Sequence, residues 1–332
     1  MIYVNNESDN PFFNHALEEY VLKNMDEDVF ILWKNRPAIL IGRNQNTLTE
    51  INEEYVKGEN IDVVRRLSGG GTVFNDYGNI NFTFITKKSQ NQSSLKNGFE
   101  KFALPVIKAL ESLGVRAIFT GRNDILVDEK KISGNAQYYY KNKILHHGTL
   151  LFSGNLDKLG KALKMKPLKY QDKGVKSVRS RVTNISEHLS NKMDVMEFKN
   201  YLKEYIMEYY NIREEYVLNN QEIEQVIEIQ KNRFESKEWN YGKISEYNFL
   251  KEEKFTSGTV EILMRIRNGI IEKLKIHGDF FGEKSILILE NILQGSGLDE
   301  EEIMLKLQGI NVDDYIKGLS LQELVGLLTL ND

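Results

Sequence analysis

Apolar residues recur along this chain with two different periods. Between Pro11 and Val21 they return every three or four positions, which predicts an amphipathic helix that begins at the proline. Residues 79–84 alternate polar and apolar instead, which predicts a strand with one buried face. By the same criteria we expect strands at 29–33, 38–42, 115–119, 124–127, 131–137 and 144–152, a strand, glycine loop and strand within 62–86, and helices at 99–113, 194–210 and 220–236.

Helices and strands do not alternate strictly in this order. Runs of strands with a few helices between them predict an α+β fold with a largely antiparallel sheet. After the sequence WNYGK at 239–243 we expect a smaller unit, with strands near 258–266 and 269–276 and a helix near 283–293. Because 332 residues exceed one typical domain, we predict two domains, 1–246 and 247–332.

Composition excludes several classes of protein. The formal net charge of −4 argues against electrostatic capture of nucleic acid, which needs a strongly basic face. The chain has no cysteine, so it forms neither a disulfide nor a thioester with an acyl group. No window approaches the length of a membrane-spanning apolar run, and the N-terminus lacks the basic and apolar regions of a signal peptide. We therefore expect a soluble, cytoplasmic protein.

The segment RRLSGGGTVF at 65–74 is the strongest candidate for a binding site. Three consecutive glycines after a strand allow the backbone to approach a ligand and to point N–H groups at an anion. Arg65 and Arg66 add guanidinium groups, which pair well with carboxylate or phosphate. A glycine-rich hairpin with two solvated arginines is the alternative. The segment lacks the GxxxxGK[ST] pattern of a Walker loop.

Two further segments place polar residues in an otherwise apolar region. Asn123 and Asp124 offer an amide and a carboxylate, which suit a nucleotide hydroxyl or a Mg²⁺–phosphate group. On an extended strand Lys131, Ser133 and Asn135 would share one face. A solvated turn lysine is the alternative for Lys131 by itself.

Histidine and basic residues give two weaker signals. In HHGT at 146–149, His147 and Thr149 fall on one strand face, so His147 either shapes a pocket or is a structural strand histidine. The basic segment KSVRSRV at 176–182 either closes over phosphates or is solvated. The histidines show no metal-ligand spacing such as HExxH.

Together these segments resemble the lipoate–protein ligase A family. The resemblance covers most of the chain and rests on RRLSGGGTVF, NDYGNINFTF, GRNDILVDEKKISGNAQ, HHGTLL, SVRSRVTNI and WNYGK. It implies an α+β large domain of the biotin/lipoate ligase type, followed from residue 247 by the small accessory domain of members that perform adenylation and transfer unaided. Asn75 departs from the histidine that the family commonly shows, which argues against an acid–base role at this position.

The resemblance also implies roles for individual residues. Lys131 matches the family's essential lysine, a catalytic residue that also binds the substrates. Asn123 and Asp124 match the region that holds the nucleotide and Mg²⁺, with Asp124 as the metal ligand. The segment that wraps the acyl adenylate corresponds to Arg66, Gly71, Thr72, Val73 and Phe74. Further candidates for the pocket are Ser68, Gly69, Gly70, Asp76, Asn79, Ser133, His147, Lys176, Ser177 and Arg181.

The implied reaction uses ATP, Mg²⁺ and lipoate. Lipoate becomes lipoyl-AMP with release of pyrophosphate, and the lipoyl group passes to a lysine of a lipoyl-domain protein. Such acceptors are the acyltransferase subunits of 2-oxo-acid dehydrogenases and the glycine-cleavage carrier protein. Ile80, Phe82 and Phe84, or their neighbours, would line the acyl pocket. The alternatives are an octanoate-preferring or non-catalytic acyl-binding relative, a biotin ligase, and an octanoyl transferase, whose cysteine nucleophile this chain lacks.

Overall fold

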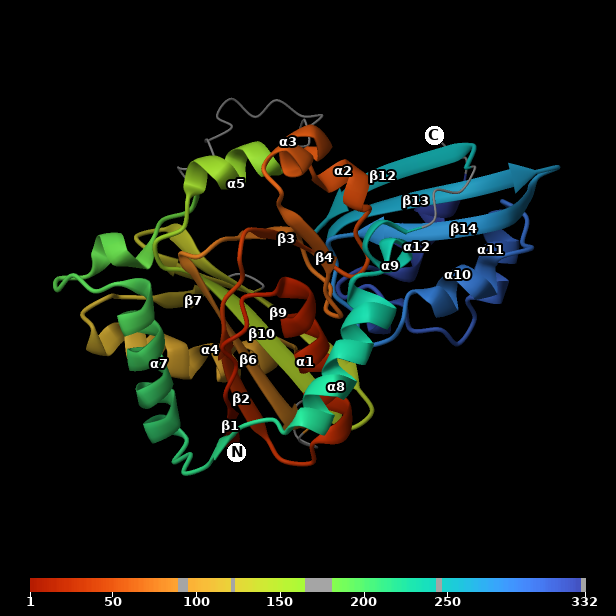
Figure 1. The fold of residues 1–332 in the computed structure, drawn as a ribbon. Helices are drawn as coiled ribbons and strands as arrows, with labels where there is room; N and C mark the ends of the chain where they lie inside the picture. The colour runs from red at the N-terminus through yellow and green to blue at the C-terminus, as the bar shows by residue number, and fades with distance from the viewer. Residues whose placement is uncertain (89–94, 121–122, 165–180, 243–246, 330–332) are drawn as a thin grey trace. The chain divides into compact units, whose positions relative to one another are not determined.

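The chain divides into two compact units, whose elements Figure 1 colours in chain order. The computed structural model describes residues 1–88, 95–120, 123–164, 181–242 and 247–329, and of residues 95–97 only the backbone. The first unit comprises Met1–Leu40, Leu48–Arg65 and Val73–Asn240, and the second comprises Ile41–Thr47, Arg66–Thr72 and the chain from Tyr241 on. The domain limits 1–246 and 247–332 stay a prediction, and two short N-terminal segments group with the C-terminal unit.

An eight-stranded sheet forms the centre of the first unit, in the order β11-β1-β2-β6-β10-β9-β8-β7. Neighbours from β2 to β7 are antiparallel, whereas β1 is parallel to both of its neighbours. The fold is therefore α+β with a largely antiparallel sheet, which confirms the prediction. The strands are β1 (Ile2–Val4), β2 (Val29–Trp33), β6 (Asn79–Lys87), β7 (Ile118–Thr120), β8 (Asp124–Val127), β9 (Lys130–Tyr140), β10 (Lys143–Leu151) and β11 (Glu215–Tyr216).

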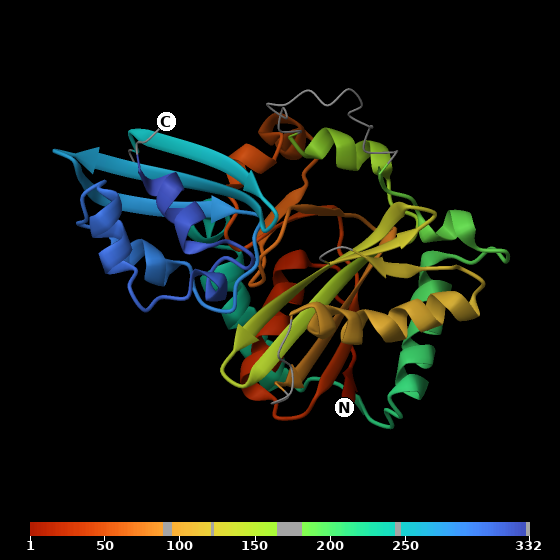
Figure 2. The same cartoon turned by 180° about the vertical axis from the view of Figure 1, so that it is seen from behind.

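One face of this sheet carries the apolar core of the unit. The helices α4 (Leu95–Ser112) and α7 (Val195–Tyr209) lie on this side, as Figure 2 shows for α4. Ile80, Phe82 and Phe84 point into the core and are fully buried. The sequence allowed either these three side chains or their neighbours on β6 to line the acyl pocket. Because the three belong to the apolar core, only the neighbours, which lie on the opposite face, remain candidates.

The opposite face is crossed by α1 (Pro11–Asn24), which Figure 1 shows in front of the strands. The helix begins where the sequence predicted, because Oδ1 of Asn10 accepts hydrogen bonds from the first free N–H groups and Pro11 follows at the first helical position. Helix α8 (Asn220–Ile229) packs beside α1. The remaining elements of the unit are α2 (Thr47–Glu50), α3 (Glu53–Gly58), α5 (Leu156–Ala162), α9 (Lys237–Tyr241), the short helices η1 (Ile185–His188) and η2 (Gln230–Phe234), and a small sheet β4-β3-β5 formed by Asp62–Arg65, Ala38–Ile41 and Val73–Asn75.

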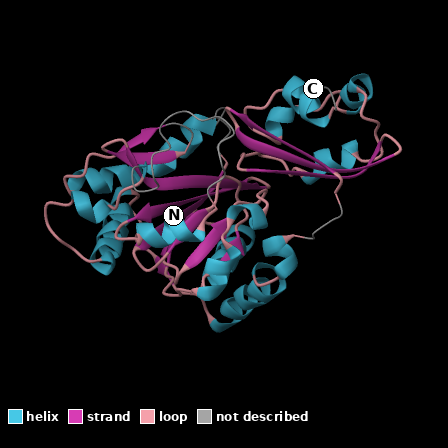
Figure 3. Cartoon of the chain, turned by 90° about the horizontal axis from the view of Figure 1, so that it is seen from above, coloured by secondary structure: helices cyan, strands magenta, loops and turns pink. Residues whose placement is uncertain are grey.

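The second unit is built on a three-stranded antiparallel sheet backed by short helices (Figure 3). Its strands are β12 (Phe249–Phe255), β13 (Gly258–Arg267) and β14 (Ile270–Gly278), and its helices are α10 (Leu287–Leu293), α11 (Glu300–Lys306), η3 (Val312–Asp314) and α12 (Leu321–Leu328). The unit has an apolar core of its own. Among the residues that the structure describes, no helix combines the length and the apolar character that crossing a membrane requires.

Candidate functional site

A β-bulge places Lys131 beside Asp124. In the ladder of β8 and β9, Leu126 pairs with Lys131 but Ile125 pairs with Ser133, so β9 carries one extra residue between them. The Nζ atom of Lys131 lies 2.8 Å from Oδ1 of Asp124, and the two side chains are 38% and 34% exposed. An ammonium and a carboxylate thus meet at one surface of the sheet, within reach of a ligand.

Gly134 leaves the space that the side chain of Lys131 occupies. It pairs with Asp124 across the ladder, and a Cβ atom on Gly134 would lie 3.0 Å from Nζ of Lys131. Lys131 therefore shares its face with Gly134 and Asp124, while Ser133 and Asn135 project from the other face. The prediction that Lys131, Ser133 and Asn135 share one face is wrong, because the bulge shifts the alternation by one residue.

Asn123 lies at the start of the same corner. Its Nδ2 donates to the carbonyl oxygen of Asn135 at 2.7 Å, and its own carbonyl oxygen accepts from the backbone N–H of Asn135 at 2.9 Å. Because Asp124 follows directly, the two residues predicted to hold nucleotide and metal lie in one corner with Lys131.

The backbone of Lys131 is also paired with the segment that follows residue 180. Lys131 and Val182 form a parallel bridge, and the N–H of Thr183 donates to the carbonyl oxygen of Lys131 at 3.1 Å. Arg181 is exposed beside this pairing. Lys176 and Ser177 lie outside the described residues, so their contribution to the site stays a prediction.

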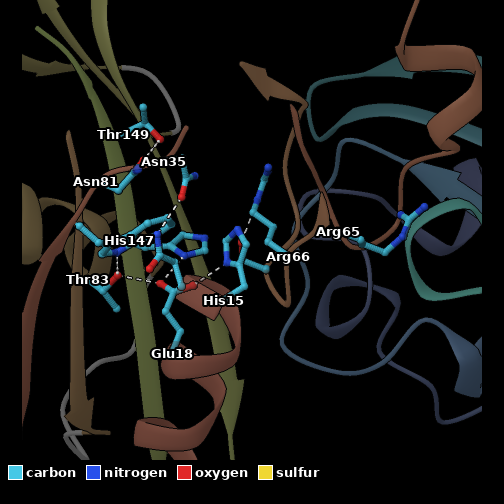
Figure 4. Close-up of polar contacts among 12 residues, drawn as sticks. His15, Glu18, Asn35, Arg65, Arg66, Asn81, Thr83, His147 and Thr149 are labelled. Carbon is cyan, nitrogen blue, oxygen red and sulfur yellow. Dashed lines mark hydrogen bonds and ion pairs between the residues drawn. The ribbon is translucent and has the colours of Figure 1, made fainter. Parts of the chain in front are cut away.

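His147 lies on the same sheet face and points toward α1 (Figure 4). Its Nδ1 lies 2.9 Å from Oε1 of Glu18, and Nδ1 of His15 lies 2.8 Å from Oε2 of that carboxylate. The hydroxyl of Thr83 donates to Oε1 of Glu18 at 2.7 Å and accepts from Nε1 of Trp33 at 2.9 Å. Glu18 is therefore a buried acceptor for three donors, and it fixes the orientation of His147.

Glu18 is ionised in this network. Burial raises its pKa, but the charge of His147 and the hydrogen bonds from His147 and His15 outweigh burial, so the pKa of Glu18 lies well below its usual range. A carboxylate carries no proton, so each histidine donates from Nδ1. The ligand atoms of the three residues lie within 4.8 Å of one another, as in a metal site, but these hydrogen bonds account for their arrangement. Sequence reasoning missed Glu18 and His15, although two polar residues at i, i+3 inside an apolar helix were a usable signal.

A second polar network joins buried side chains on this face. Oδ1 of Asn75 accepts from Nδ2 of Asn35 at 3.1 Å and from Nδ2 of Asn81 at 2.8 Å. The hydroxyl of Thr149 donates to Oδ1 of Asn81 at 2.7 Å (Figure 4). Asn75, which departs from the family's common histidine, is thus a structural junction between amides.

Asp76 and Asn79 shape the turn after β5. Oδ1 of Asp76 accepts from the N–H of Gly78 at 2.8 Å, and Oδ1 of Asn79 accepts from the N–H of Asp76 at 2.9 Å. The second carboxylate oxygen of Asp76 accepts from the N–H of Asn155 at 2.8 Å. These bonds tie the turn to the chain after β10, and a role in ligand binding stays a prediction for both residues.

The glycine loop belongs to the second unit. Gly70 has a φ of 88°, and its N–H donates to the carbonyl oxygen of Phe280 at 3.2 Å. A Cβ atom on Gly69 would lie 2.5 Å from the same oxygen. The hydroxyl of Thr72 donates to Oε1 of Gln45 at 2.8 Å. The N–H group of Gly70 is thus used within the second unit, and an anion at the glycine loop stays a prediction.

Arg66 braces this loop from within. Its Nε donates to the hydroxyl of Ser68 at 3.0 Å, and its Nη2 donates to the carbonyl oxygens of Gly69 at 2.9 Å and Gly71 at 2.7 Å. The conformation of the loop thus depends on the guanidinium group. The contact of Arg66 with an acyl adenylate stays a prediction.

Arg65, Val73 and Phe74 lie in the first unit. Arg65 donates to the carbonyl oxygens of Trp239 at 2.8 Å and Asn240 at 3.1 Å, so the prediction of a ligand-facing guanidinium is wrong for this residue. Phe74 is fully buried and Val73 is half-buried at the start of β5. Between these two, only Val73 offers exposed surface.

Two family models match the chain. Residues 10–207 match the lipoyl protein ligase A/B catalytic domain, and residues 245–328 match the bacterial lipoate protein ligase C-terminus. The chain belongs to the lipoate–protein ligase family. Lipoate–protein ligase 1 of Staphylococcus aureus is 43% identical to it over 327 residues, which cover 98% of each chain. The ligase is therefore similar to curated members along nearly its whole length.

Solved structures of the family share the fold of this ligase. The crystal structure of LipL1 of P. falciparum in complex with lipoate has a TM-score of 0.77 and 26% identity, and the match covers 94% of both chains. A lipoate-protein ligase A bound with ATP has a TM-score of 0.63 and 25% identity over 73% of this chain and 98% of that chain. The chain is accordingly an enzyme of the ligase class, and the fold that the resemblance implied is confirmed.

Proposed function

We propose that this ligase activates lipoate with ATP and transfers the lipoyl group to a lysine of a lipoyl-domain protein. In the first step a carboxylate oxygen of lipoate attacks the α-phosphorus of ATP, and pyrophosphate leaves. In the second step the lysine amine attacks the acyl carbon of lipoyl-AMP, AMP leaves, and the nitrogen loses a proton to form the amide. Neither step needs a covalent enzyme intermediate, which agrees with a chain that has no cysteine.

The position of Lys131 against Asp124 carries this proposal. Lipoate and ATP are both anions, and an ammonium fixed between carboxylate and α-phosphate lowers their repulsion where charge develops. Asp124 orients the ammonium before the substrates arrive, at 2.8 Å. Because about a third of each side chain is exposed, the oxygens of both substrates can reach Nζ.

Asp124 also suits a Mg²⁺ ion that accompanies ATP. Mg²⁺ prefers oxygen ligands, and proteins commonly hold it with one or two carboxylates together with phosphate oxygens and water. The carboxylate of Asp124 is partly exposed and lies directly after Asn123, which offers an amide oxygen. Asp124 would hold the ion, which would supply charge neutralisation at the leaving pyrophosphate.

The proposal places the acyl chain of lipoate on the sheet face that carries Lys131. His147 pairs with Ala136, two residues along β9 from Gly134, so both histidine and lysine project from this face. The opposite face is closed by the apolar core under α4. We infer that lipoate extends from Lys131 across this face.

We further propose that the acceptors are acyltransferase subunits of 2-oxo-acid dehydrogenases and the glycine-cleavage carrier protein.

Exchange of labelled pyrophosphate into ATP tests the proposal. In the presence of lipoate the wild-type protein should exchange, and Lys131→Ala should lose on the order of 10²–10³ in rate. Lys130→Ala is the matched control, because Lys130 is the exposed neighbour on β9 and should keep the wild-type rate. Exchange by Lys131→Ala at the rate of the control removes Lys131 from the mechanism, and a wild-type protein that does not exchange refutes the adenylation step.

A further inference from the structure

A chain of four hydrogen bonds runs along β9 and β10 on the side of the sheet that α4 covers. The hydroxyl of Tyr139 donates to Oε1 of Gln137 at 2.9 Å, and Nε2 of Gln137 lies 3.1 Å from Nδ1 of His146. Nε2 of His146 lies 3.2 Å from Oδ1 of Asn135, whose Nδ2 donates to the carbonyl oxygen of Asn123 at 3.0 Å. The chain of hydrogen bonds therefore ends at the corner described above.

The chemistry of the groups fixes the direction of every bond. An amide nitrogen only donates, so Nδ1 of His146 must accept from Gln137 and the ring proton must sit on Nε2. That proton points at Oδ1 of Asn135, which turns the amide nitrogen of Asn135 toward Asn123. All four bonds thus donate in the same direction, and the arrangement requires a neutral His146 with one tautomer.

Aromatic rings surround the side chain of His146. The side chain is fully buried, and its ring centroid lies 6.0, 5.5 and 4.8 Å from the rings of Phe82, Phe99 and Phe102. Burial lowers the pKa of His146 well below its usual value, with a further contribution from the charge of His147. The neutral form that the hydrogen bonds need is therefore the form that this environment favours.

The last hydrogen bond of the chain helps to hold the residue before Asp124. Asn135 holds Asn123 through three hydrogen bonds, two that converge on the carbonyl oxygen of Asn123 and one from Nδ2 of Asn123 back to the carbonyl oxygen of Asn135. Asp124 is the next residue and contacts Nζ of Lys131 at 2.8 Å. A rotation of the Asn135 amide would remove one of the three hydrogen bonds and loosen Asn123, the residue before the carboxylate that orients the ammonium.

We propose that His146 is a positioning residue, which acts through Asn135 to hold Asn123 and Asp124 in the orientation that nucleotide binding needs. The proposal rests on the proposed function for the role of this corner. It assigns His146 no contact with a substrate. The first histidine of the pair thus serves the nucleotide corner from the core side of the sheet, while the second projects from the substrate side.

Two substitutions at His146 test the proposal through substrate saturation. His146→Phe keeps an aromatic ring among its neighbours but cannot donate to Asn135, whereas His146→Gln retains an amide nitrogen that can. In pyrophosphate exchange His146→Phe should raise the KM for ATP about tenfold, the value of one hydrogen bond, with the KM for lipoate nearly unchanged. His146→Gln should restore most of the loss. A purely structural defect lowers kcat without separating the two KM values, and that result overturns the proposal.

A milder pair of variants keeps the test valid if His146→Phe does not fold. Tyr139→Phe removes the hydroxyl that begins the chain of hydrogen bonds, and Tyr140→Phe makes the same change one residue along β9. Tyr139→Phe should raise the KM for ATP by about threefold, and Tyr140→Phe should leave it unchanged. Equal values for the two variants contradict the proposal.

Nitrogen NMR of histidine separates this inference from the proposed reaction. In protein with ¹⁵N-labelled histidine, the signal that disappears in His146→Gln should show a neutral ring with its proton on Nε2. A proton on Nδ1 refutes the inference whichever reaction the protein catalyses. A wild-type protein with the expected signal but no pyrophosphate exchange would refute the proposed function and leave the hydrogen-bond chain in place.

Discussion

The carboxylate of Glu18 is the best place to test how the buried network contributes to stability. Glu18→Gln keeps the size of the side chain but replaces one acceptor oxygen by an NH₂ group. That group must face at least one of the three donors, His15, His147 or Thr83. The substitution therefore removes a hydrogen bond to a charged group and leaves a buried donor without an acceptor.

The expected loss is about 3 kcal/mol of unfolding free energy. A hydrogen bond to a charged group contributes about 1.5–3 kcal/mol, and a buried donor left unsatisfied costs about 1–3 kcal/mol. For a unit of this size about 2–4 °C of melting temperature corresponds to each kcal/mol, so Tm should fall by about 6–12 °C. Glu54→Gln is the control, because Glu54 is exposed and should melt with the wild type.

The contribution of Glu18 to the free energy of unfolding should depend on pH. The pKa of Glu18 is lowered in the folded protein, so unfolded chains take up the proton first as the pH falls. The stability that Glu18 contributes is fully present above the unfolded value of 4.5 and decreases below it. The Tm of wild type should therefore exceed that of Glu18→Gln at pH 7, and the difference should shrink as the pH falls below about 4.5. Equal Tm values at pH 7, or a difference that grows on acidification, refute the reasoning.

Alanine substitutions at three glycines should have three different effects, a loss of stability, a gain of stability and a loss of activity. Gly148→Ala should fold poorly or lose about 2 kcal/mol in urea unfolding, because its Cβ atom would lie 2.5 Å from Oδ1 of Asn135 and closer still to the ring of Phe82. Gly160→Ala should gain about 0.5–1 kcal/mol in the same assay, since nothing lies within 4 Å of the new atom in α5, and a loss contradicts the assigned helix. Gly134→Ala should lower pyrophosphate exchange with little change in Tm, because the methyl group displaces Nζ of Lys131, and unaltered exchange counts against the Lys131 site.

Sequence periodicity predicted the central elements of the fold. Strand β8 runs from Asp124 to Val127 as expected, and α1 begins at Pro11. Strands β1 and β11 were missed because three and two residues are too few to show a period. Strand β12 was missed because charged residues occupy much of this edge strand. Helix α4 begins at Leu95, four residues before the predicted start. The first turn was missed because its polar composition is more typical of a loop.

The candidate site was only partly accessible from the sequence. Its motifs identified Lys131, Asp124 and His147, whose contacts the structure then describes. The bulge in β9 cannot be read from one sequence, because a single inserted residue leaves the polar and apolar pattern almost unchanged. The carboxylate that orients His147 belongs to Glu18, more than a hundred residues earlier in the chain. A contact between residues so far apart in sequence cannot be predicted from local sequence patterns.

The glycine loop belongs to the same compact unit as the C-terminal part of the chain, so truncation of that part should affect the loop. Gly70 depends on the carbonyl group of Phe280, and the N–H of Gly278 donates to the carbonyl oxygen of Asn44 at 2.9 Å. A polypeptide shortened before β12 would keep the sequence of the glycine loop but lose the carbonyl group of Phe280 that binds it. The C-terminal segment thus holds a loop that lies far earlier in the sequence. A chimera of two relatives would therefore have to take the loop and the C-terminal segment from the same parent.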